Sequence, residues 1–193
     1  MNNRFFIIPL LFIAAVSLSS CGYNSMVEKQ EAVVSKWSEV ENQYQRRSDL
    51  IPNLVETVKG YAAHEQGTFT AVIEARAKAT SVNVDPSKLD AESIRKFQEA
   101  QAGLSSALSK LMVVVENYPD LKANQNFMEL QAQLEGTENR ITVARKNFNE
   151  SVQDYNTYIR KFPQLMFSGM FGFEKKGYFE AKEGTENAPA VKF

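Results

Sequence analysis

The stretch that decides the fold is residues 127–162, FMELQAQLEGTENRITVARKNFNESVQDYNTYIRKF. Seam positions recur there at alternating spacings of three and four, the period of one face of an α-helix. They are Phe127, Leu130, Leu134, Thr137, Ile141, Ala144, Phe148, Val152, Tyr155, Ile159 and Phe162. The pattern runs for about ten helical turns and stops at Pro163. It predicts a long amphipathic helix whose apolar face needs partner helices.

Three earlier segments show the same period and predict helices over residues 24–47, 50–80 and from about 87 to 118. Pro52 cannot donate a hydrogen bond to the carbonyl of Ser48, so a turn at Ser48–Asp49 is favoured over a kink there. Four helices of comparable length pack most simply as an antiparallel four-helix bundle. The sequence therefore predicts an all-α fold, whereas a kinked first helix would give three helices of unequal length.

The N-terminus predicts the compartment. Arg4 precedes an apolar run from Phe5 to Leu18, and Leu18-Ser19-Ser20-Cys21 ends that run with small residues before a cysteine. This pattern is typical of a lipoprotein signal peptide, residues 1–20, which is removed when Cys21 takes a diacylglycerol and a further acyl chain such as palmitate. The run is shorter than the roughly 20 residues of a membrane span. Two or more acyl chains would hold the mature protein durably at a membrane.

Composition narrows the classes of function. The net charge is −1, which gives no overall field for nucleic acid. The chain has one cysteine, in the lipobox, and one histidine, His64, which leaves no disulfide, haem or thiolate metal pattern and no obvious nucleophile and base pair. We expect no cofactor, no metal and no catalytic residue, and hence a protein that is not an enzyme.

One polar cluster stands out: Arg46, Arg47, Asp49 and Asn53, beside Pro52. Arginine side chains can form bidentate hydrogen bonds with carboxylates or phosphates, so the cluster is a candidate interaction site. The same residues can instead be structural: Asp49 can cap a helix, Asn53 can satisfy backbone groups freed by Pro52, and Arg46 can pair with an acid of another helix. Both interpretations stay open at the level of sequence.

Aromatic residues on the helical seams are expected in the core: Trp37, Tyr44, Tyr61, Tyr118 and Tyr155. After Pro163, residues 164–173 are rich in aromatic and apolar side chains, with Phe167, Met170, Phe171 and Phe173 among them. This stretch predicts either packing against the end of the bundle, which is favoured, or contact with the membrane, for which it lacks a basic face. Residues 184–193 are polar, lack periodicity and are expected to be disordered.

Several strings resemble the LemA family and cover most of residues 23–180. They are Trp37-Ser38, Arg46-Arg47-Ser48-Asp49-Leu50-Ile51-Pro52-Asn53-Leu54-Val55, Val58-Lys59-Gly60-Tyr61, His64-Glu65, Ala75-Arg76, Glu116-Asn117-Tyr118-Pro119-Asp120-Leu121-Lys122-Ala123, Arg140 with Arg145, and Tyr155-Asn156. The resemblance implies a bacterial membrane-anchored helical domain, here over residues 21–183, and supplies no reaction. A lipobox departs from the uncleaved N-terminal helix that many members use as an anchor.

These observations favour a non-enzymatic, lipid-anchored envelope protein that binds or scaffolds another envelope protein. The alternative is a module that binds a small ligand or envelope polymer between the helices, near Arg46, Asp49 and Asn53. The domain is expected outside the cytoplasm, on the outer membrane in a Gram-negative cell, and self-association is left open.

Overall fold

The computed structural model describes residues 4–180, and side chains from Gly22 onward. All regular secondary structure between residues 4 and 180 is helical, with no strand, as the all-α prediction from the sequence requires. Its elements are α1 (Arg4–Lys59), α2 (Gln66–Ser81), α3 (Ala91–Val115), α4 (Pro119–Lys122), α5 (Gln125–Ile159) and α6 (Leu165–Ser168). Residues 184–193, the predicted disordered tail, lie outside the described residues.

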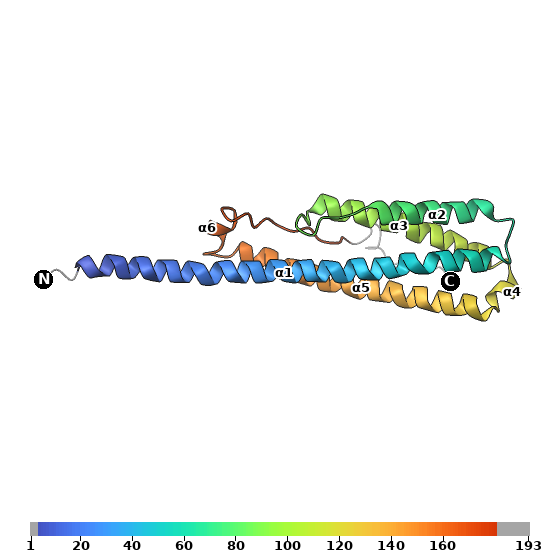
Figure 1. The fold of residues 1–193 in the computed structure, drawn as a ribbon, viewed down its shortest axis with the longest axis horizontal. Coiled ribbons are helices and arrows are strands. Elements are labelled where there is room, and N and C mark those ends of the chain that lie inside the picture. The colour runs from blue at the N-terminus through green and yellow to red at the C-terminus, as the bar shows by residue number, and fades with distance from the viewer. Residues whose placement is uncertain (1–3, 181–193) are drawn as a thin grey trace, which may run out of the picture.

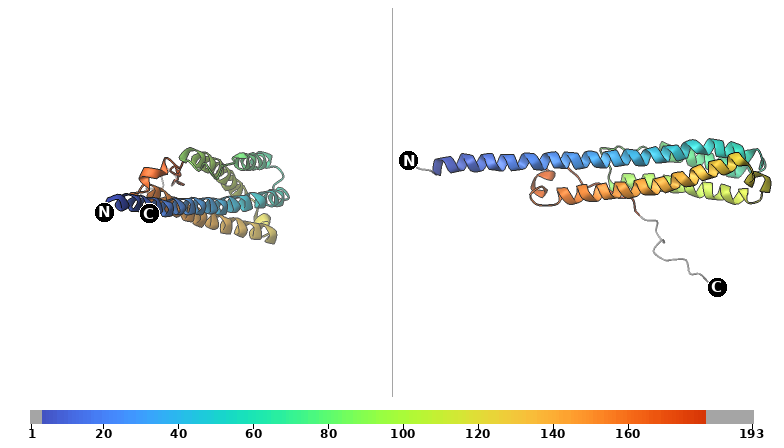
Figure 2. Two further views of the ribbon diagram at one scale, coloured as in Figure 1. Left: turned by 60° about the vertical axis from the view of Figure 1, so that its left-hand side comes forward. Right: turned by 90° about the horizontal axis from the view of Figure 1, so that it is seen from below.

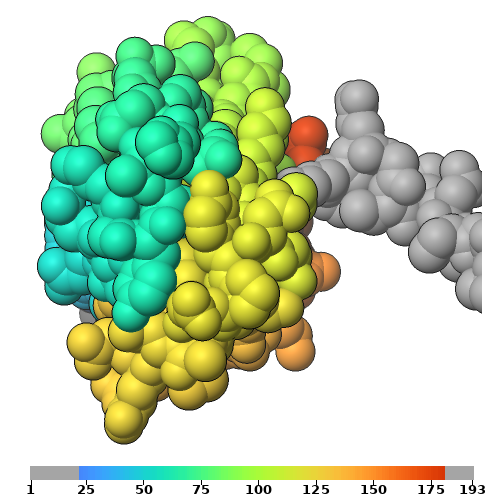
Figure 3. Space-filling model, turned by 90° about the vertical axis from the view of Figure 1, so that its right-hand side faces the viewer, coloured from blue at the N-terminus to red at the C-terminus, as the bar shows by residue number. Residues whose placement is uncertain are grey.

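The long helices form two antiparallel pairs that lie along one axis. The first pair is α1 with α5, and the second is α2 with α3 (Figures 1 and 2). Seen from the end far from the N-terminus, the turns that follow α1 and α3 cover the end of the molecule (Figure 3). The helices are 56, 16, 25 and 35 residues long, so the expectation of four comparable helices is wrong.

The predicted turn at Ser48–Asp49 is wrong, because α1 passes through Pro52 and ends only at Lys59. The helices predicted over 24–47 and 50–80 are accordingly replaced by one long α1 and a short α2. Proline costs a helix its hydrogen bond to the carbonyl four residues earlier. Here Arg76 of α2 supplies the missing donor, since its Nε lies 2.8 Å from the Ser48 carbonyl oxygen. The chain turns at residues 60–65 instead, after Gly60.

Side-chain caps fix the starts of the other long helices. Asp90 accepts a hydrogen bond from the Ser93 amide and caps α3, which therefore begins later than the Asp85-Pro86 turn suggested. Asn124 accepts from the Phe127 amide and caps α5, as expected for Asn124 or Asn126. The third helix ends at Val115 rather than Tyr118, and Pro119 opens α4.

Two hydrophobic cores lie one after the other along the axis. The anchor-side core, nearer the N-terminus, is rich in aromatic rings and contains Trp37, Phe97, Phe148 and Phe179. The distal core is mainly aliphatic and is built around Ile51, Leu54, Val58, Leu104 and Leu111. Arg47, Ser48, Gln101 and Thr137 are buried polar residues that fall between the two along α1, α3 and α5.

The aromatic residues expected in the core divide between interior and surface. Trp37, Tyr44 and Tyr155 are buried, which confirms three of the predictions. Tyr61 is 44% exposed, because it lies in the turn after α1 rather than on a helix, and Tyr118 is half-buried. Over residues 22–180, no helix has an apolar stretch long enough to cross a bilayer.

Candidate functional site

The predicted polar cluster is not one site. Arg46, Asp49 and Asn53 are exposed on α1, whereas Arg47 is only 3% exposed and points into the body. Asp49 accepts a hydrogen bond from Gln45 at 2.7 Å and lies inside α1, so it caps no helix. These four residues therefore do not form one exposed interaction patch, because Arg47 is buried.

Arg47 joins three helices through its guanidinium group. Its Nη2 donates to Gln101 Oε1 at 2.6 Å, and its Nη1 donates to Ser105 Oγ and Glu138 Oε2, each at 3.1 Å. The ring of Tyr44 lies 5.0 Å from the guanidinium carbon. A buried cation requires such a set of partners, because removing it from water is costly. Arg47 is thus a structural tie between α1, α3 and α5. The sequence suggested Arg46 for a pairing with an acid of another helix, but Arg46 is exposed and Arg47 makes that pair.

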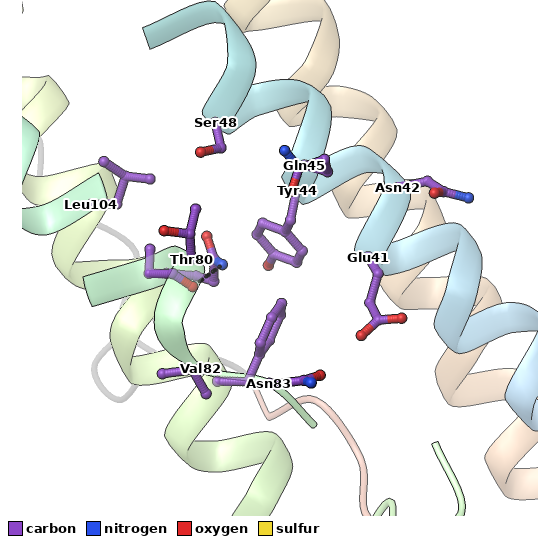
Figure 4. A pocket seen from close by; sticks show the side chains of 12 residues that line it. Glu41, Asn42, Tyr44, Gln45, Ser48, Thr80, Val82, Asn83 and Leu104 are labelled. Atoms are coloured by element: carbon purple, nitrogen blue, oxygen red, sulfur yellow. Dashed lines mark hydrogen bonds between the residues drawn. The ribbon is translucent and has the colours of Figure 1, made fainter. Parts of the chain in front are cut away.

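A polar cavity of about 420 Å³ lies on one side of this tie, between α1 and the α2–α3 hairpin (Figure 4). Its lining combines carboxylate, amide, hydroxyl and aromatic side chains. The residues are Glu41, Asn42, Tyr44, Gln45, Ser48, Ala79, Thr80, Val82, Asn83, Phe97, Gln101 and Leu104. Figure 4 shows Glu41, Tyr44 and Ser48 of α1 facing Thr80, Val82 and Asn83 across the cavity. Its size is within the range of small-molecule sites.

The cavity holds two perturbed acids and one unsatisfied hydroxyl. Burial raises the pKa of the Glu41 carboxyl above its usual value. Burial also raises the pKa of the Tyr44 hydroxyl, and the nearby charges of Arg145 and Arg47 partly oppose this shift. Ser48 Oγ is buried and has no hydrogen-bond partner among the described residues. A polar group in this state favours a ligand that can bond to it.

A second hollow, of about 350 Å³, lies on the other side of the Arg47 tie. We call it the α3–α5 furrow, since α3 and α5 form its walls and Arg47 of α1 its floor. It is lined by Arg47, Ser105, Leu108, Ser109, Met112, Gln131, Leu134, Glu135 and Glu138. Leu108, Met112 and Leu134 give it an apolar stripe, and the two glutamates make one rim acidic.

Closer to the N-terminal end, α3 and α5 hold an extended segment, residues 174–180, which we call the C-terminal strap. Asn156 donates to the Lys176 carbonyl at 2.8 Å and accepts from the Lys176 amide at 2.9 Å. Asn149 makes the same pair of bonds with Phe179, and Gln98 of α3 makes it with Glu180. Three side-chain amides thus bind backbone much as a neighbouring strand would.

The strap also fills the anchor-side core. The Phe179 ring stacks on Trp37 at 5.9 Å and meets Phe148 edge-on at 5.5 Å, with the Arg145 guanidinium 4.7 Å above it. Lys176 donates from Nζ to the Ser87 carbonyl at 2.7 Å, and burial lowers its pKa. Sequence reasoning missed this role for Asn149 and Asn156. The available signal was their spacing of seven residues, which places both on one face of α5.

Between residues 22 and 180, no group of three or more His, Cys, Asp or Glu side chains is placed to hold a metal ion. His64 is exposed in the turn between α1 and α2, rather than on a helix as expected. Cys21 lies outside the residues whose side chains are described, so its lipidation stays a prediction.

An elongated helical body with a buried arginine tie and a C-terminal strap is the class of protein that these elements define. The chain belongs to the LemA family, whose model matches residues 36–193. The resemblance noted from sequence motifs is thereby confirmed. Because the match begins at residue 36, it does not include Cys21.

The chain is similar to three magnetosome proteins and to a protein named LemA. Magnetosome protein MamQ 2 of Paramagnetospirillum magneticum is 27% identical over 190 residues, covering 90% of this chain and 70% of the relative. Magnetosome protein MamQ of Magnetospirillum gryphiswaldense has the same identity and coverage. Protein LemA of Metamycoplasma hominis is 23% identical over 164 residues, covering 83% of this chain and 71% of the relative.

Proposed function

We propose that this protein is a non-enzymatic, lipid-anchored envelope protein that binds a segment of another envelope protein in the α3–α5 furrow. Its working body would be the antiparallel arrangement of α1, α2, α3 and α5. The lipobox ending at Cys21 supports attachment through lipid, after removal of residues 1–20. The likeness to magnetosome proteins, which are named for an organelle, supports a role at a cellular structure rather than in bulk solution.

The furrow is the observation that carries this proposal. It is open, it runs between two long helices, and Leu108, Met112 and Leu134 give it an apolar stripe of the kind that interaction grooves use. Glu135 and Glu138 on the rim favour a partner segment that carries a basic residue beside apolar ones. The Glu138 carboxylate is 57% exposed, so it can pair with a partner while it still faces Arg47.

The strap supports an extended partner. The same two helices that wall the furrow already hold seven residues of extended chain through Gln98, Asn149 and Asn156. Recognition through backbone atoms with a few side-chain pockets is a general way of binding peptides. The partner segment would thus bind in the open furrow as the strap binds within the chain, through its backbone atoms.

Site-specific photo-cross-linking in living cells tests the proposal. A benzophenone amino acid at Met112, in the furrow, should capture one envelope protein. The same probe at Ile73, which is 55% exposed on α2 outside the furrow, should not. The product should also be lost when Leu134→Glu is added in a chain whose circular dichroism is unchanged, and should weaken in Cys21→Ala.

Equal capture at Met112 and Ile73, or capture that Leu134→Glu leaves intact, would contradict the furrow as the binding site. A cross-linked product made of two copies of this chain would assign the furrow to self-association.

The polar cavity supports a second candidate, a binding module for a small polar ligand or envelope polymer. Its specific observation is the buried Ser48 Oγ with no partner among the described residues. The ligand would then bind at a different face of α1 from the one that carries Arg46, Asp49 and Asn53, near which the sequence predicted it. Native mass spectrometry of the purified full chain should show an added mass that Ser48→Leu removes and the exposed Ser38→Leu retains. No added mass in any variant would count against this candidate.

A further inference from the structure

The loop after α5 exposes an unusual concentration of apolar side chains. We call residues 162–171 the anchor-end loop. Within it Phe162 is 80% exposed, Leu165 60%, Met166 65%, Met170 76% and Phe171 52%. Isolated exposed apolar residues are normal on a protein surface, but a contiguous group marks a contact with something apolar.

The loop is an ordered part of the fold. Phe173 is buried next to it, the Phe173 amide donates to the Ser168 carbonyl at 2.9 Å, and Ser168 itself is buried. The short helix α6 lies inside the loop, with the Leu165 amide bonded to the Lys161 carbonyl at 2.9 Å. The packing favoured from the sequence therefore holds for Phe173, while Met170 and Phe171 point outward.

The loop lies beside the first described side chains of α1. The ring of Tyr23 meets the ring of Phe171 edge-on at 5.3 Å and that of Phe173 at 5.6 Å. Gly22 lies against the Gln164 side chain. Tyr23 is two residues from Cys21 and follows the apolar run that ends at Leu18. Figure 1 shows α6 beside this part of α1, at the end of the body nearest the N-terminus.

Charged residues around the loop suit a bilayer surface. Arg160 and Lys161 precede Phe162 and are exposed, and Lys175 is exposed after Phe173. Exposed acids nearby are Glu28 and Glu174. Cations that flank apolar side chains match a membrane interface, where the chains enter the acyl boundary and the cations meet lipid phosphates. Residues 164–173 carry no basic side chain, and these flanking residues supply the cations.

We propose that the anchor-end loop inserts Phe162, Leu165, Met166, Met170 and Phe171 into the interfacial layer of the membrane that holds the chain's N-terminus. The inference rests on the membrane attachment in the proposed function. It requires only that the chain meets the bilayer next to Tyr23, which a lipid on Cys21 and an apolar N-terminal helix would both provide. The loop then sets the orientation of the body as a second point of contact.

Depth-dependent fluorescence quenching tests this placement. The full, membrane-processed chain is reconstituted into vesicles of phosphatidylethanolamine and phosphatidylglycerol that contain a shallow spin-labelled lipid. Trp37 is fully buried and gives the wild-type baseline. Met170→Trp should add quenched, blue-shifted emission. Val113→Trp is the matched control, because Val113 is 69% exposed near the end of α3 and belongs to the opposite end of the body.

Flotation of the same vesicles separates the two levels of the proposal. Protein that floats, with quenching for Met170→Trp but only the wild-type level for Val113→Trp, supports the inference. Protein that floats with no added quenching for Met170→Trp overturns the loop contact and leaves the anchor intact. Protein that does not float overturns the membrane attachment itself.

Discussion

The anchor-side core and the distal core differ in how they are completed. The distal core forms almost wholly from side chains of helices, with Ile51 and Leu54 of α1 and Leu111 of α3 in one buried cluster. The anchor-side core is finished by Phe179, which arrives on an extended strap after the last long helix. One half is thus closed by regular packing, and the other depends on a segment held by side-chain amides. The half nearer the proposed membrane is therefore the half whose core is completed by a segment outside the long helices.

The largest expected effect comes from displacing the strap. A Cβ at Gly177 would lie 2.6 Å from Cα and 2.7 Å from the backbone nitrogen of Ala91, which no side-chain movement can relieve. Gly177→Ala should expel the strap and uncover the Phe179 pocket. Loss of a buried phenylalanine typically costs about 3–5 kcal/mol, and we expect the free energy of unfolding in urea to fall by about that amount.

Gly103→Ala is the matched control, because Gly103 is exposed inside α3 and a Cβ there meets nothing within 4 Å. It should stabilise the protein by up to about 1 kcal/mol through helix propensity. Equal stability of the Gly177→Ala variant and the wild type would show that the strap does not close the anchor-side core.

Removing the polar tie should affect both cores together. Arg47→Ala leaves Gln101 Oε1 buried without its 2.6 Å partner and opens space beside Tyr44. We expect a loss of about 2–3 kcal/mol of unfolding free energy, measured by urea denaturation. Arg47→Met keeps the apolar stem and should lose less. Identical losses for the two variants would mean that the hydrogen bonds, and not the stem, account for the whole effect.

A smaller effect should link Pro52 to Arg76. Arg76→Ala removes the donor to the Ser48 carbonyl and should cost about 1–2 kcal/mol. In a Pro52→Ala background the restored amide can serve that carbonyl, so the same Arg76→Ala change should cost less. A double-mutant cycle measures this coupling, and additive losses would refute it.

The smallest effect at neutral pH concerns Tyr155. Its hydroxyl is buried with no hydrogen-bond partner among the described residues, so Tyr155→Phe should change the unfolding free energy by less than about 1 kcal/mol. Burial, together with the charge of Glu174, raises the pKa of Tyr155 from 10.0 to about 12. The unfolded state then releases this proton at lower pH than the folded state.

This difference favours unfolding as the pH rises, so the stability contributed by Tyr155 should be lost between pH 10 and about pH 12. Urea denaturation across this range should give a shallower decline for Tyr155→Phe than for the wild type. Parallel declines would place the alkaline sensitivity elsewhere.

Helices with a regular apolar pattern could be predicted from the sequence. Features that depend on contacts between residues far apart in the chain could not. The seam of α5 and its cap at Asn124 followed from local patterns. The continuity of α1 through Pro52 did not, because its remedy is an arginine 28 positions away on another helix. The expectation that proline ends a helix considers only neighbouring residues, so it does not include a hydrogen-bond donor from another helix.

The candidate site shows the same division. Sequence reasoning gave the pairing with an acid to Arg46, although Arg47 lies on the seam between Tyr44 and Ile51 at spacings of three and four. A charged residue on an apolar seam does not fit the hydrophobic pattern, and its partners become visible only in the tertiary structure. The strap was missed because residues 174–180 have no periodicity, and their order comes from Gln98, Asn149 and Asn156. Side-chain recognition of backbone leaves no repeat in the recognised segment.

The unbroken α1 also fixes a height. From Gly22 to Lys59 the helix rises about 55 Å at 1.5 Å per residue. If the anchor-end loop is inserted, α1 stands roughly upright on the membrane. The turn at residues 60–65 and the adjacent end of the α3–α5 furrow then lie tens of ångströms above the lipid. A partner would then be met at a set distance from the membrane. The Arg76 hydrogen bond to the Ser48 carbonyl, which offsets the donor missing at Pro52, supports the unbroken rod that sets this distance.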